Sequence, residues 1–487
     1  MRKLISLLLA MTMVFSLAIT VSAQNNSITI NNAKVGETYK LYKLFDLVVD
    51  SESAPTKYSY TVNASWKRFF EGTGANLVLI DEEGYVTDIN PNNASTTEPK
   101  DDAAVLAEKA AAWANANTVS AIKTQEATDG MVSFANLDAG YWLITSTLGT
   151  VAMTETTPDK NAVSVNEKNP ENTITKTVKE DSTGAYGATN DAQIGDTVEF
   201  KSTVKIVKGT RNVVVHDKMD SGLTYTAGSV AIDGLTKGTE FAVNESPADG
   251  DTFDITFTQS WIDGLAFGTD GYKEYEITYT AVLNKNAVVK GDNGVAIEDQ
   301  ENKTHVSFGD ASSSTEEKTT TTTHKFRVFK HAKDSTANLA GAVFELKKGA
   351  QSVALIQLDD NNYRVATSEE INAVAPKAVT TEPSGNKLVS RFTTVAEGDI
   401  VIWGVDADTD YSLEEVSPPD GYNRLKNPVS VAVKADNSTR VAVENNAGTE
   451  LPSTGGMGTT LFYILGGVFL VAGVILLVIK KRMGSVK

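Results

Sequence analysis

Short stretches in which apolar and polar residues alternate recur throughout residues 24–450. They are rich in Val, Ile, Thr and Tyr, and Gly, Asn and Asp separate them. Because successive side chains of a strand point to opposite faces, this period of two predicts half-buried β-strands. Clear examples are residues 197–206, 275–283, 326–330 and 429–433. Such regularly spaced short strands predict an all-β protein of tandem immunoglobulin-like β-sandwich modules.

Helical patterns are few. Residues 101–117 are rich in Ala, carry acids in the first turn, and place Leu106, Ala110 and Trp113 on one face. This pattern predicts an amphipathic helix. Two shorter helices are predicted at residues 64–71 and 368–374.

Two apolar stretches lie near the ends of the chain. In residues 1–23, a basic start, an apolar core and small residues at the end form the pattern of a secretory signal peptide. Residues 461–479 are uncharged and long enough to cross a bilayer as a transmembrane helix. Residues 480–487 begin with three bases, which the positive-inside bias holds in the cytoplasm. The part between the two stretches is therefore expected outside the cell.

Two polar segments divide the exported part of the chain. One is residues 166–172, which include a proline, and the other is residues 311–319, which are rich in Ser, Thr and Glu. They predict an N-terminal module at 24–170, a second module at 171–315 and a third module at 316–450. The threonines at 319–323 are expected to begin an edge strand that runs into residues 324–330, because Thr favours strands.

Charge and composition exclude several classes of function. The chain has 44 Lys and Arg residues against 62 Asp and Glu residues, a formal net charge of −18. An acidic body repels phosphate backbones, so nucleic acid is not expected as a partner. The absence of Cys excludes thiol catalysis, thiolate metal sites and disulfides. The four His residues show no paired spacing on a helix face, so we expect neither a metal site nor a cofactor.

Three polar residues of the third module each continue an apolar stripe on one face of a predicted strand. Lys330 follows Val328, Glu415 follows Leu413, and Asn445 follows Val443, each two residues later. All three are therefore expected in the core. Burying any of them without a partner costs several kcal/mol.

The second module repeats this pattern. Lys176 shares a face with Ile174 and Val178, Asp217 shares one with Val213 and Val215, and Asn302 shares one with Thr304 and Val306. Lys179 falls on the polar face of its strand and is rejected as the buried lysine. Asp220 stays open as an alternative acid.

Several segments resemble domains of Gram-positive surface proteins. Residues 339–346 and 411–422 resemble the collagen-adhesin B-type domain, and residues 213–225 resemble the second domain of fimbrial major subunits. Residues 38–46 and 139–144 resemble the N-terminal domain of the same subunits. In these families a lysine and an asparagine join as an intramolecular isopeptide bond, which a buried acid promotes.

The resemblance implies two such bonds and their acids. They are Lys176 to Asn302 with Asp217, and Lys330 to Asn445 with Glu415. A third bond from Lys43 to Asn169 is implied for the N-terminal module, with no acid assigned. The chemistry is physically sound, because burial lowers the pKa of a lysine and yields a neutral amine nucleophile. A buried acid can polarise the asparagine carbonyl and relay the proton, and proximity replaces an external catalyst.

A sorting motif precedes the predicted transmembrane helix. Leu451, Pro452, Ser453, Thr454 and Gly455, followed by an apolar span and a basic tail, resemble the signal of sortase substrates. The resemblance implies cleavage between Thr454 and Gly455 and transfer of the Thr454 carbonyl to an amine. It also implies sortase and peptidoglycan as partners.

Residues 163–169 resemble the pilin motif that supplies such an amine. The two alternating valines, Lys168 and Asn169 match, while Asn166 and Glu167 replace the usual Tyr-Pro. Lys168 follows a strand and precedes a proline, so it is expected in an exposed loop. Lys160 and Lys179 stay open as alternative linkage lysines.

Taken together, these features predict a structural protein, not an enzyme. The first reading is the major subunit of a pilus on the cell wall, in which identical subunits join head to tail. The alternative is a monomeric, sortase-anchored adhesin for a host or bacterial surface ligand. An exported enzyme is disfavoured, since the sequence contains no Ser/His/Asp arrangement with local support and no paired carboxylates on a recognisable barrel.

Overall fold

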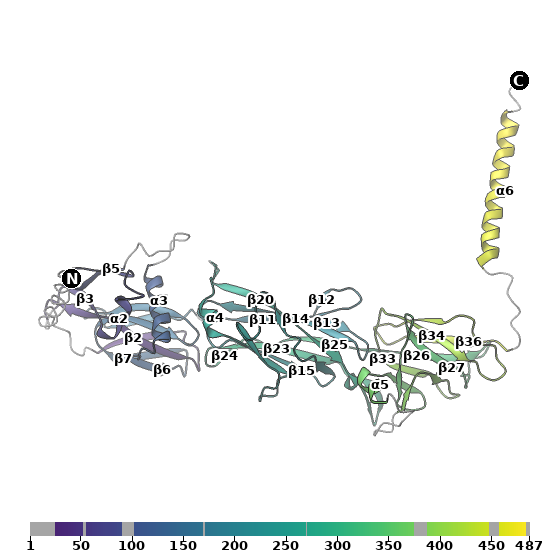
Figure 1. The fold of residues 1–487 in the computed structure, drawn as a ribbon, viewed down its shortest axis with the longest axis horizontal. Helices are drawn as coiled ribbons and strands as arrows, with labels where there is room; N and C mark the ends of the chain where they lie inside the picture. The colour runs from purple at the N-terminus through teal and green to yellow at the C-terminus, as the bar shows by residue number, and fades with distance from the viewer. Residues whose placement is uncertain are drawn as a thin grey trace. The chain divides into compact units, whose positions relative to one another are not determined.

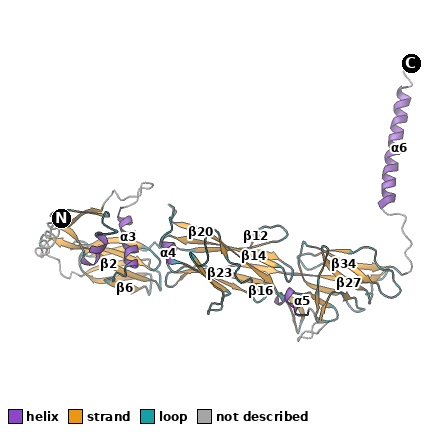
Figure 2. Cartoon of the chain, viewed as in Figure 1, coloured by secondary structure: helices purple, strands orange, loops and turns teal. Residues whose placement is uncertain are grey.

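The computed structural model describes residues 25–51, 55–89, 102–168, 171–268, 270–374, 387–447 and 457–483. Strands dominate these residues and helices are few (Figure 2), which confirms the all-β prediction. The predicted signal peptide and the sorting motif lie outside the described residues. Figure 1 follows the chain from the N-terminal strands to the C-terminal helix.

The described residues form two compact units. The first contains residues up to 190 together with 196–287 and 298–322, and the second contains 191–195, 288–297 and the residues from 323 onward.

Two sheets form the N-terminal part of the first unit. One has the strand order β4-β5-β3-β2-β8-β9, with β6 beside β2, and the other has the order β10-β1-β7. The strands of the larger sheet are β2 (Thr38–Val49), β3 (Tyr58–Val62), β4 (Val78–Ile80), β5 (Tyr85–Ile89), β6 (Lys123–Glu126), β8 (Gly140–Ser146) and β9 (Val151–Thr156). Those of the smaller sheet are β1 (Asn26–Asn31), β7 (Met131–Leu137) and β10 (Ala162–Asn166).

The helices of this part lie where the sequence predicted them. They are η1 (Ala64–Trp66), α2 (Lys67–Phe70) and α3 (Asp102–Ala116). Leu106 and Ala110 on the inner face of α3 are fully buried in one core with Trp66 and Phe69. Apolar burial along one helix face thus anchors α3 to the larger sheet.

Two further sheets follow within the first unit. One has the order β12-β11-β14-β20-β16, with β17 beside β20, and the other has the order β13-β25-β23-β15-β19-β18, with β24 beside β23. The first is made of β11 (Thr173–Lys179), β12 (Tyr186–Gly187), β14 (Thr197–Val207), β16 (Leu223–Tyr225), β17 (Ala231–Ile232) and β20 (Tyr272–Leu283). The second is made of β13 (Thr189–Asp191), β15 (Val214–Met219), β18 (Phe241–Asn244), β19 (Phe253–Phe257), β23 (Gln300–Phe308), β24 (Ser312–Ser313) and β25 (Glu317–Thr322). The short helices α4 (Gln259–Asp263) and η3 (Lys285–Ala287) connect these strands. The hairpin of β21 (Val288–Gly291) and β22 (Gly294–Ile297) follows in the sequence but belongs to the second unit.

A buried carboxylate ties the N-terminal strands to the end of the second module. Glu37 is 0% exposed and accepts hydrogen bonds from the Asp310 and Ala311 backbone N–H groups at 2.8 and 3.0 Å. The hydroxyls of Ser312 and Thr147 each donate to it at 2.6 Å. Burial raises the pKa of Glu37, but these four donors outweigh it and hold the pKa below its ordinary value. The carboxylate is therefore stabilised in its charged form.

Two sheets form the second unit. One has the order β31-β29-β30-β33-β26-β36, and the other has the order β28-β27-β34-β35, with β32 beside β27. The first comprises β26 (His324–Ala332), β29 (Leu355–Gln357), β30 (Asn362–Val365), β31 (Lys387–Val389), β33 (Ile400–Val405) and β36 (Arg440–Asn445). The second comprises β27 (Val343–Lys348), β28 (Gln351–Ser352), β32 (Phe392–Thr393), β34 (Asp410–Ser417) and β35 (Val429–Ala432). The predicted helix at 368–374 is α5 (Ser368–Val374).

The threonine run does not lead into the strand of Lys330, contrary to the expectation from sequence. It ends β25 at Thr322, and a separate strand, β26, begins at His324. The reason is that Thr319 and Thr321 are buried in the sheet of β23, which pairs with β25. The Thr321 hydroxyl also donates to the Asn190 side chain at 2.7 Å, which keeps the run in that sheet.

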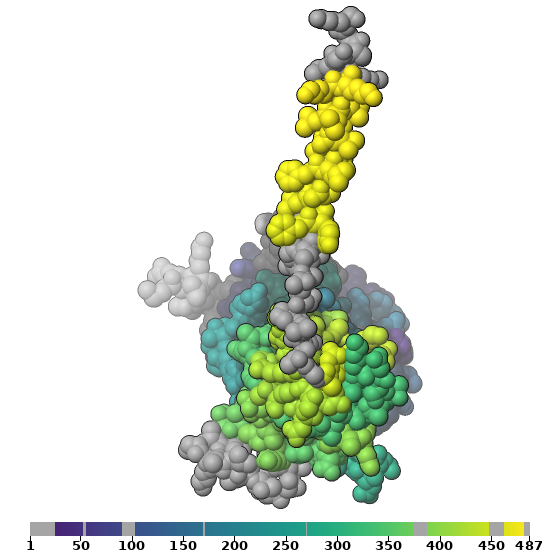
Figure 3. Space-filling view, turned by 90° about the vertical axis from the view of Figure 1, so that its right-hand side faces the viewer, coloured from purple at the N-terminus to yellow at the C-terminus, as the bar shows by residue number. Residues whose placement is uncertain are grey.

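The last element is the helix α6 (Met457–Met483). By length and composition, its residues Phe462–Lys481 could cross a membrane. Its large apolar side chains are exposed, as in Phe462, Tyr463 and Phe469. Figure 3 draws this helix in yellow. A long apolar surface of this kind is unfavourable in water and suits a lipid environment.

Candidate functional site

The structure brings Lys176, Asp217 and Asn302 together in the core of the second module. We call these three residues the Lys176 cluster. Lys176 lies on β11, while Asp217 and Asn302 lie on the neighbouring strands β15 and β23. The side chains of Lys176 and Asp217 are 0% and 1% exposed, and Asn302 is 0% exposed. The alternation of apolar and polar residues along each strand therefore predicted correctly that these three side chains lie on the buried face.

A tyrosine that the sequence analysis missed connects the three side chains. Lys176 Nζ lies 2.5 Å from Asp217 Oδ2 and also donates to the Tyr279 hydroxyl. The Tyr279 hydroxyl donates to Asp217 Oδ2, and Asn302 Nδ2 donates to the same hydroxyl at 3.3 Å. On its strand, Tyr279 continues the apolar stripe of Ile277 and Ala281. Because aromatic residues on such stripes usually serve packing, the sequence offered no signal for this role.

Burial controls the protonation of the Lys176 cluster. Desolvation lowers the pKa of Lys176 and raises the pKa of Asp217, although their mutual attraction opposes both changes. Both shifts favour the neutral pair, an amine beside a carboxylic acid. A neutral amine is the form of Lys176 that a nucleophilic attack on Asn302 requires.

Aromatic rings enclose this pair. The ring of Phe200 stacks on Tyr279 with a centroid distance of 5.5 Å, and Phe253 meets Tyr279 edge-on at 4.9 Å. Lys176 Nζ lies 5.6 Å from the centroid of Phe200. These rings keep water away from the amine and so maintain its desolvation.

Asp220, the alternative acid, lies away from this cluster. Its side chain is exposed and accepts a hydrogen bond from the Glu301 backbone N–H at 2.8 Å. Lys179, the rejected lysine, pairs with Glu199 at 3.1 Å with both side chains more than a third exposed. The geometry therefore favours Asp217 and Lys176 over these alternatives.

The third module contains a second cluster of the same three residue types, which we call the Lys330 cluster. Lys330, Glu415 and Asn445 are at most 2% exposed. Strands β26 and β36 are parallel neighbours, and Lys330 is in register with Val443, two residues before Asn445. Lys330 Nζ donates to the Val443 carbonyl at 3.1 Å. The amine and the Asn445 amide therefore lie on the same face of adjacent strands.

Glu415 reaches this amide from the facing sheet. Asn445 Nδ2 donates to Glu415 Oε1 and Oε2 at 2.9 and 3.2 Å, and to the Asn423 carbonyl at 3.0 Å. The Leu425 backbone N–H fixes the carboxyl group with a 2.7 Å hydrogen bond. Burial lowers the pKa of Lys330 to about 8, although Glu415 and Glu444 attract its charge. A substantial share of the Lys330 amine is therefore neutral near physiological pH.

In the N-terminal module, Lys43 pairs with an acid of its own strand. Its amine lies 3.0 Å from Asp46 Oδ1, and its side chain is 12% exposed. Asn63 Nδ2 donates to both oxygens of Asp46 at 3.0 Å. Asn169, the expected partner of Lys43, lies outside the described residues. The third bond thus stays a prediction.

Lys168 is exposed and lies two residues after the end of β10. Lys160, an alternative linkage lysine, is bound to Glu155, which also accepts a 2.9 Å hydrogen bond from Tyr60. Attraction to Glu155 raises the pKa of Lys160 and so holds its amine in the charged form. Lys168 is therefore the better placed of the two to act as a nucleophile.

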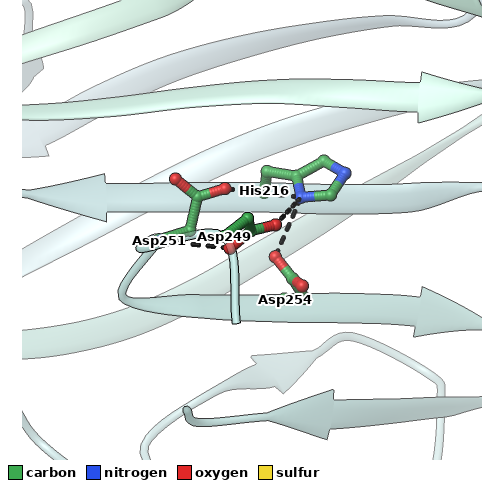
Figure 4. A group of neighbouring side chains, drawn as sticks. All are labelled: His216, Asp249, Asp251 and Asp254. Atoms are coloured by element: carbon green, nitrogen blue, oxygen red, sulfur yellow. Dashed lines mark hydrogen bonds and ion pairs between the residues drawn. The ribbon is translucent and has the colours of Figure 1, made fainter. Parts of the chain in front are cut away.

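A separate polar group of the second module gathers around His216 (Figure 4). His216 Nδ1 faces three carboxylates, those of Asp254 at 2.9 Å, Asp251 at 3.5 Å and Asp249 at 4.0 Å. The other ring nitrogen contacts the Ser307 hydroxyl at 2.8 Å. Nitrogen and carboxylate oxygen atoms of this kind are able to hold a divalent cation. Histidine spacing alone could not reveal this group, because the aspartates come from a distant part of the chain.

Comparisons with known proteins agree with the predicted class. The family described as a prealbumin-like fold domain (SpaA) matches residues 324–447, and the LPXTG cell wall anchor motif matches residues 443–483. The chain is thus a surface protein that α6 holds transiently in the membrane before attachment to the cell wall. These matches agree with the predicted β-sandwich of the third module and with the predicted wall-sorting signal. No curated protein matches the chain.

Solved structures of pilins resemble the chain at low sequence identity. The RrgB pilus protein of Streptococcus pneumoniae is 14% identical, with 89% of this chain and 100% of that chain covered and a TM-score of 0.43. The major pilin SpaD of Corynebacterium diphtheriae is 17% identical, with 87% and 98% covered and a TM-score of 0.38. The pilus 2b backbone protein of group B streptococcus is 26% identical, with 57% and 99% covered and a TM-score of 0.38.

Proposed function

We propose that this protein is the structural subunit of a covalent cell-surface pilus. Sortase would join subunits through Thr454, and intramolecular lysine–asparagine bonds would stiffen each one. The observation that carries the proposal is the repetition of one buried arrangement, lysine with acid and asparagine, in two successive modules of a wall-anchored chain. In a chain without Cys, such bonds are a covalent reinforcement that the side chains present can supply.

The Lys330 cluster supports the proposed intramolecular chemistry. The neutral Lys330 amine attacks Cγ of Asn445, a new C–N bond forms, the bond from Cγ to Nδ2 breaks, and ammonia leaves. The amine loses one proton and the leaving nitrogen gains one, so the proton count balances. Glu415 contacts the leaving nitrogen directly and is placed to relay this proton. Burial of all three groups holds the reactants in place throughout the step.

The exposed Lys168 supports the proposed intermolecular link. Its amine attacks the Thr454 carbonyl that sortase holds as an acyl-enzyme, and the enzyme is released. One amide bond then joins each subunit to the next. The first module supplies the amine and the sorting motif supplies the acyl group, so the chain grows head to tail.

Two measurements test the proposal. The intact mass of the full chain, purified after signal removal, is expected to fall short of the sequence mass by at least two ammonia units. Lys176→Ala and Lys330→Ala are each expected to restore one unit. A wild-type mass equal to the sequence mass would rule out the internal bonds.

An immunoblot of cell wall extract tests polymerisation. A ladder of high-mass species that resists boiling in detergent is expected. A single anchored band would instead identify the protein as a monomeric wall-anchored adhesin. The ladder depends on Lys168, whereas the ammonia loss does not, so the two parts of the proposal fail separately.

A further inference from the structure

The Tyr279 hydroxyl uses all of its hydrogen-bonding capacity within the Lys176 cluster. A phenol oxygen can donate one hydrogen bond and accept two. Here it donates to Asp217 and accepts from Lys176 and from Asn302. It thus contacts the attacking nitrogen, the acid and the leaving nitrogen of the proposed bond.

The Lys330 cluster shows what Tyr279 adds. There the Glu415 carboxyl reaches the leaving nitrogen of Asn445 directly, at 2.9 Å. In the Lys176 cluster, no hydrogen bond among the described residues joins Asp217 to Asn302, and Tyr279 contacts both. Aspartate is one methylene shorter than glutamate, and the phenol hydroxyl occupies the place between acid and amide.

From this geometry we propose that Tyr279 is a catalytic residue of isopeptide formation in the second module, relaying a proton between Asp217 and the leaving nitrogen of Asn302. The inference rests on the proposed bond between Lys176 and Asn302. It assigns the acid function of this module to Asp217 and Tyr279 acting together, where the third module uses Glu415 alone.

The relay leaves every proton accounted for. The neutral Lys176 amine forms a bond to Cγ of Asn302, and its surplus proton passes to Asp217 as the protonated acid gives its own proton to the Tyr279 oxygen. The Tyr279 hydroxyl turns and donates its original proton to Nδ2, the bond from Cγ to Nδ2 breaks, and ammonia leaves. Asp217 and Tyr279 end in the protonation states in which they began.

The surroundings of Tyr279 suit this role. Burial and the nearby Asp217 raise the pKa of Tyr279 well above its ordinary value, so the hydroxyl keeps a proton to pass on. The stacked Phe200 ring and the Phe253 edge hold the phenol ring in one orientation. With the ring held, only the hydroxyl hydrogen has to turn during the relay, so little reorganisation is needed.

The test follows both internal bonds in the same molecule. The full chain is synthesised in a cell-free system, samples are denatured at intervals, and the two cross-linked peptide pairs are quantified by mass spectrometry after digestion. In Tyr279→Phe, the bond of the Lys176 cluster is expected to form at least about tenfold more slowly. The bond of the Lys330 cluster is expected to form at its wild-type rate, so its rate serves as the internal reference.

Tyr225→Phe is the matched control. The Tyr225 ring also packs on Phe253, with a centroid distance of 4.8 Å, but its hydroxyl contacts Glu245 and not the cluster. This variant loses one hydroxyl from the same region and is expected to leave both rates unchanged. A Tyr279→Phe rate equal to that of Tyr225→Phe would overturn the inference.

A second variant guards against a folding defect. A 3-fluorotyrosine at position 279 keeps the ring and the hydroxyl but makes the hydroxyl more acidic. The ratio of the two bond-forming rates is expected to change, because the acidity of a relaying group enters the rate of proton transfer. An unchanged ratio would also overturn the inference. Absence of the Lys176–Asn302 peptide pair in the wild type would instead refute the proposed bond itself.

Discussion

Formation of the Lys330–Asn445 bond is expected to depend steeply on pH, because only the neutral Lys330 amine can attack. Burial lowers the pKa of this lysine from its ordinary value of 10.5 to about 8. At pH 7, about one tenth of the amine is then neutral, against roughly one part in three thousand for an exposed lysine. Desolvation of this side chain thus raises the reactive fraction about 300-fold.

The direction of the pH dependence follows from this shift. Below the lowered pKa, the amine is charged and the rate is expected to rise about tenfold for each pH unit. Above about pH 8, most of the amine is neutral and the rate is expected to level off.

The assay begins from unreacted protein. The full chain is held unfolded in denaturant, where the cluster cannot assemble, and is diluted into buffers between about pH 6 and pH 10. Folding is followed by tryptophan fluorescence and bond formation by the loss of ammonia in quenched samples. The reasoning fails if the rate is independent of pH once folding is complete. It also fails if the rate keeps rising tenfold per unit up to about pH 10, which is the behaviour of an unperturbed lysine.

Three further predictions concern single side chains. Glu415→Gln should keep the fold but leave Asn445 unreacted, so the intact mass should fall short of the variant's sequence mass by one ammonia unit less than in the wild type. An unchanged shortfall would contradict the role of the acid. Lys168→Arg should abolish the high-mass ladder in cells while Lys160→Arg preserves it, and the reverse result on the immunoblot would assign the link to Lys160. Glu37→Gln should lower the free energy of unfolding at neutral pH by about 1–3 kcal/mol, since it weakens buried charge-assisted hydrogen bonds. The folded-state pKa of Glu37 is depressed, so its contribution to the free energy of unfolding is fully present above the unfolded carboxyl pKa of about 4.3. This contribution is lost as the pH falls through the folded-state pKa. Identical denaturation curves for wild type and variant across this range would refute this account.

The buried lysines and acids could be predicted from the sequence, because the alternation of side chains along a strand is a local property. Lys176 and Lys330 each continue an apolar stripe, and both are buried in the structure. Register between distant strands is not local. That Asn445 lies beside Lys330 on a parallel neighbour depends on the long connection between β26 and β36, and only the family resemblance pointed to it.

Features that combine distant segments were missed. Tyr279 resembles an ordinary core aromatic in sequence, and its role depends on three side chains from three other strands. The threonine run was assigned to the wrong strand for a related reason. Thr propensity predicts a strand but not its partner, and burial of Thr321 against β23 decided the sheet.

The parallel pairing of β26 with β36 has a mechanical consequence. These are the first and last strands of the third module, so a pull on residues 323 and 447 loads two neighbouring strands in shear. With the proposed bond in place, the load crosses from Lys330 to Asn445 in a single covalent step, and the residues between them carry none of it. A stretched single molecule should then show no unfolding of this module, whereas a Lys330→Ala chain should lengthen by a further amount on the order of 400 Å.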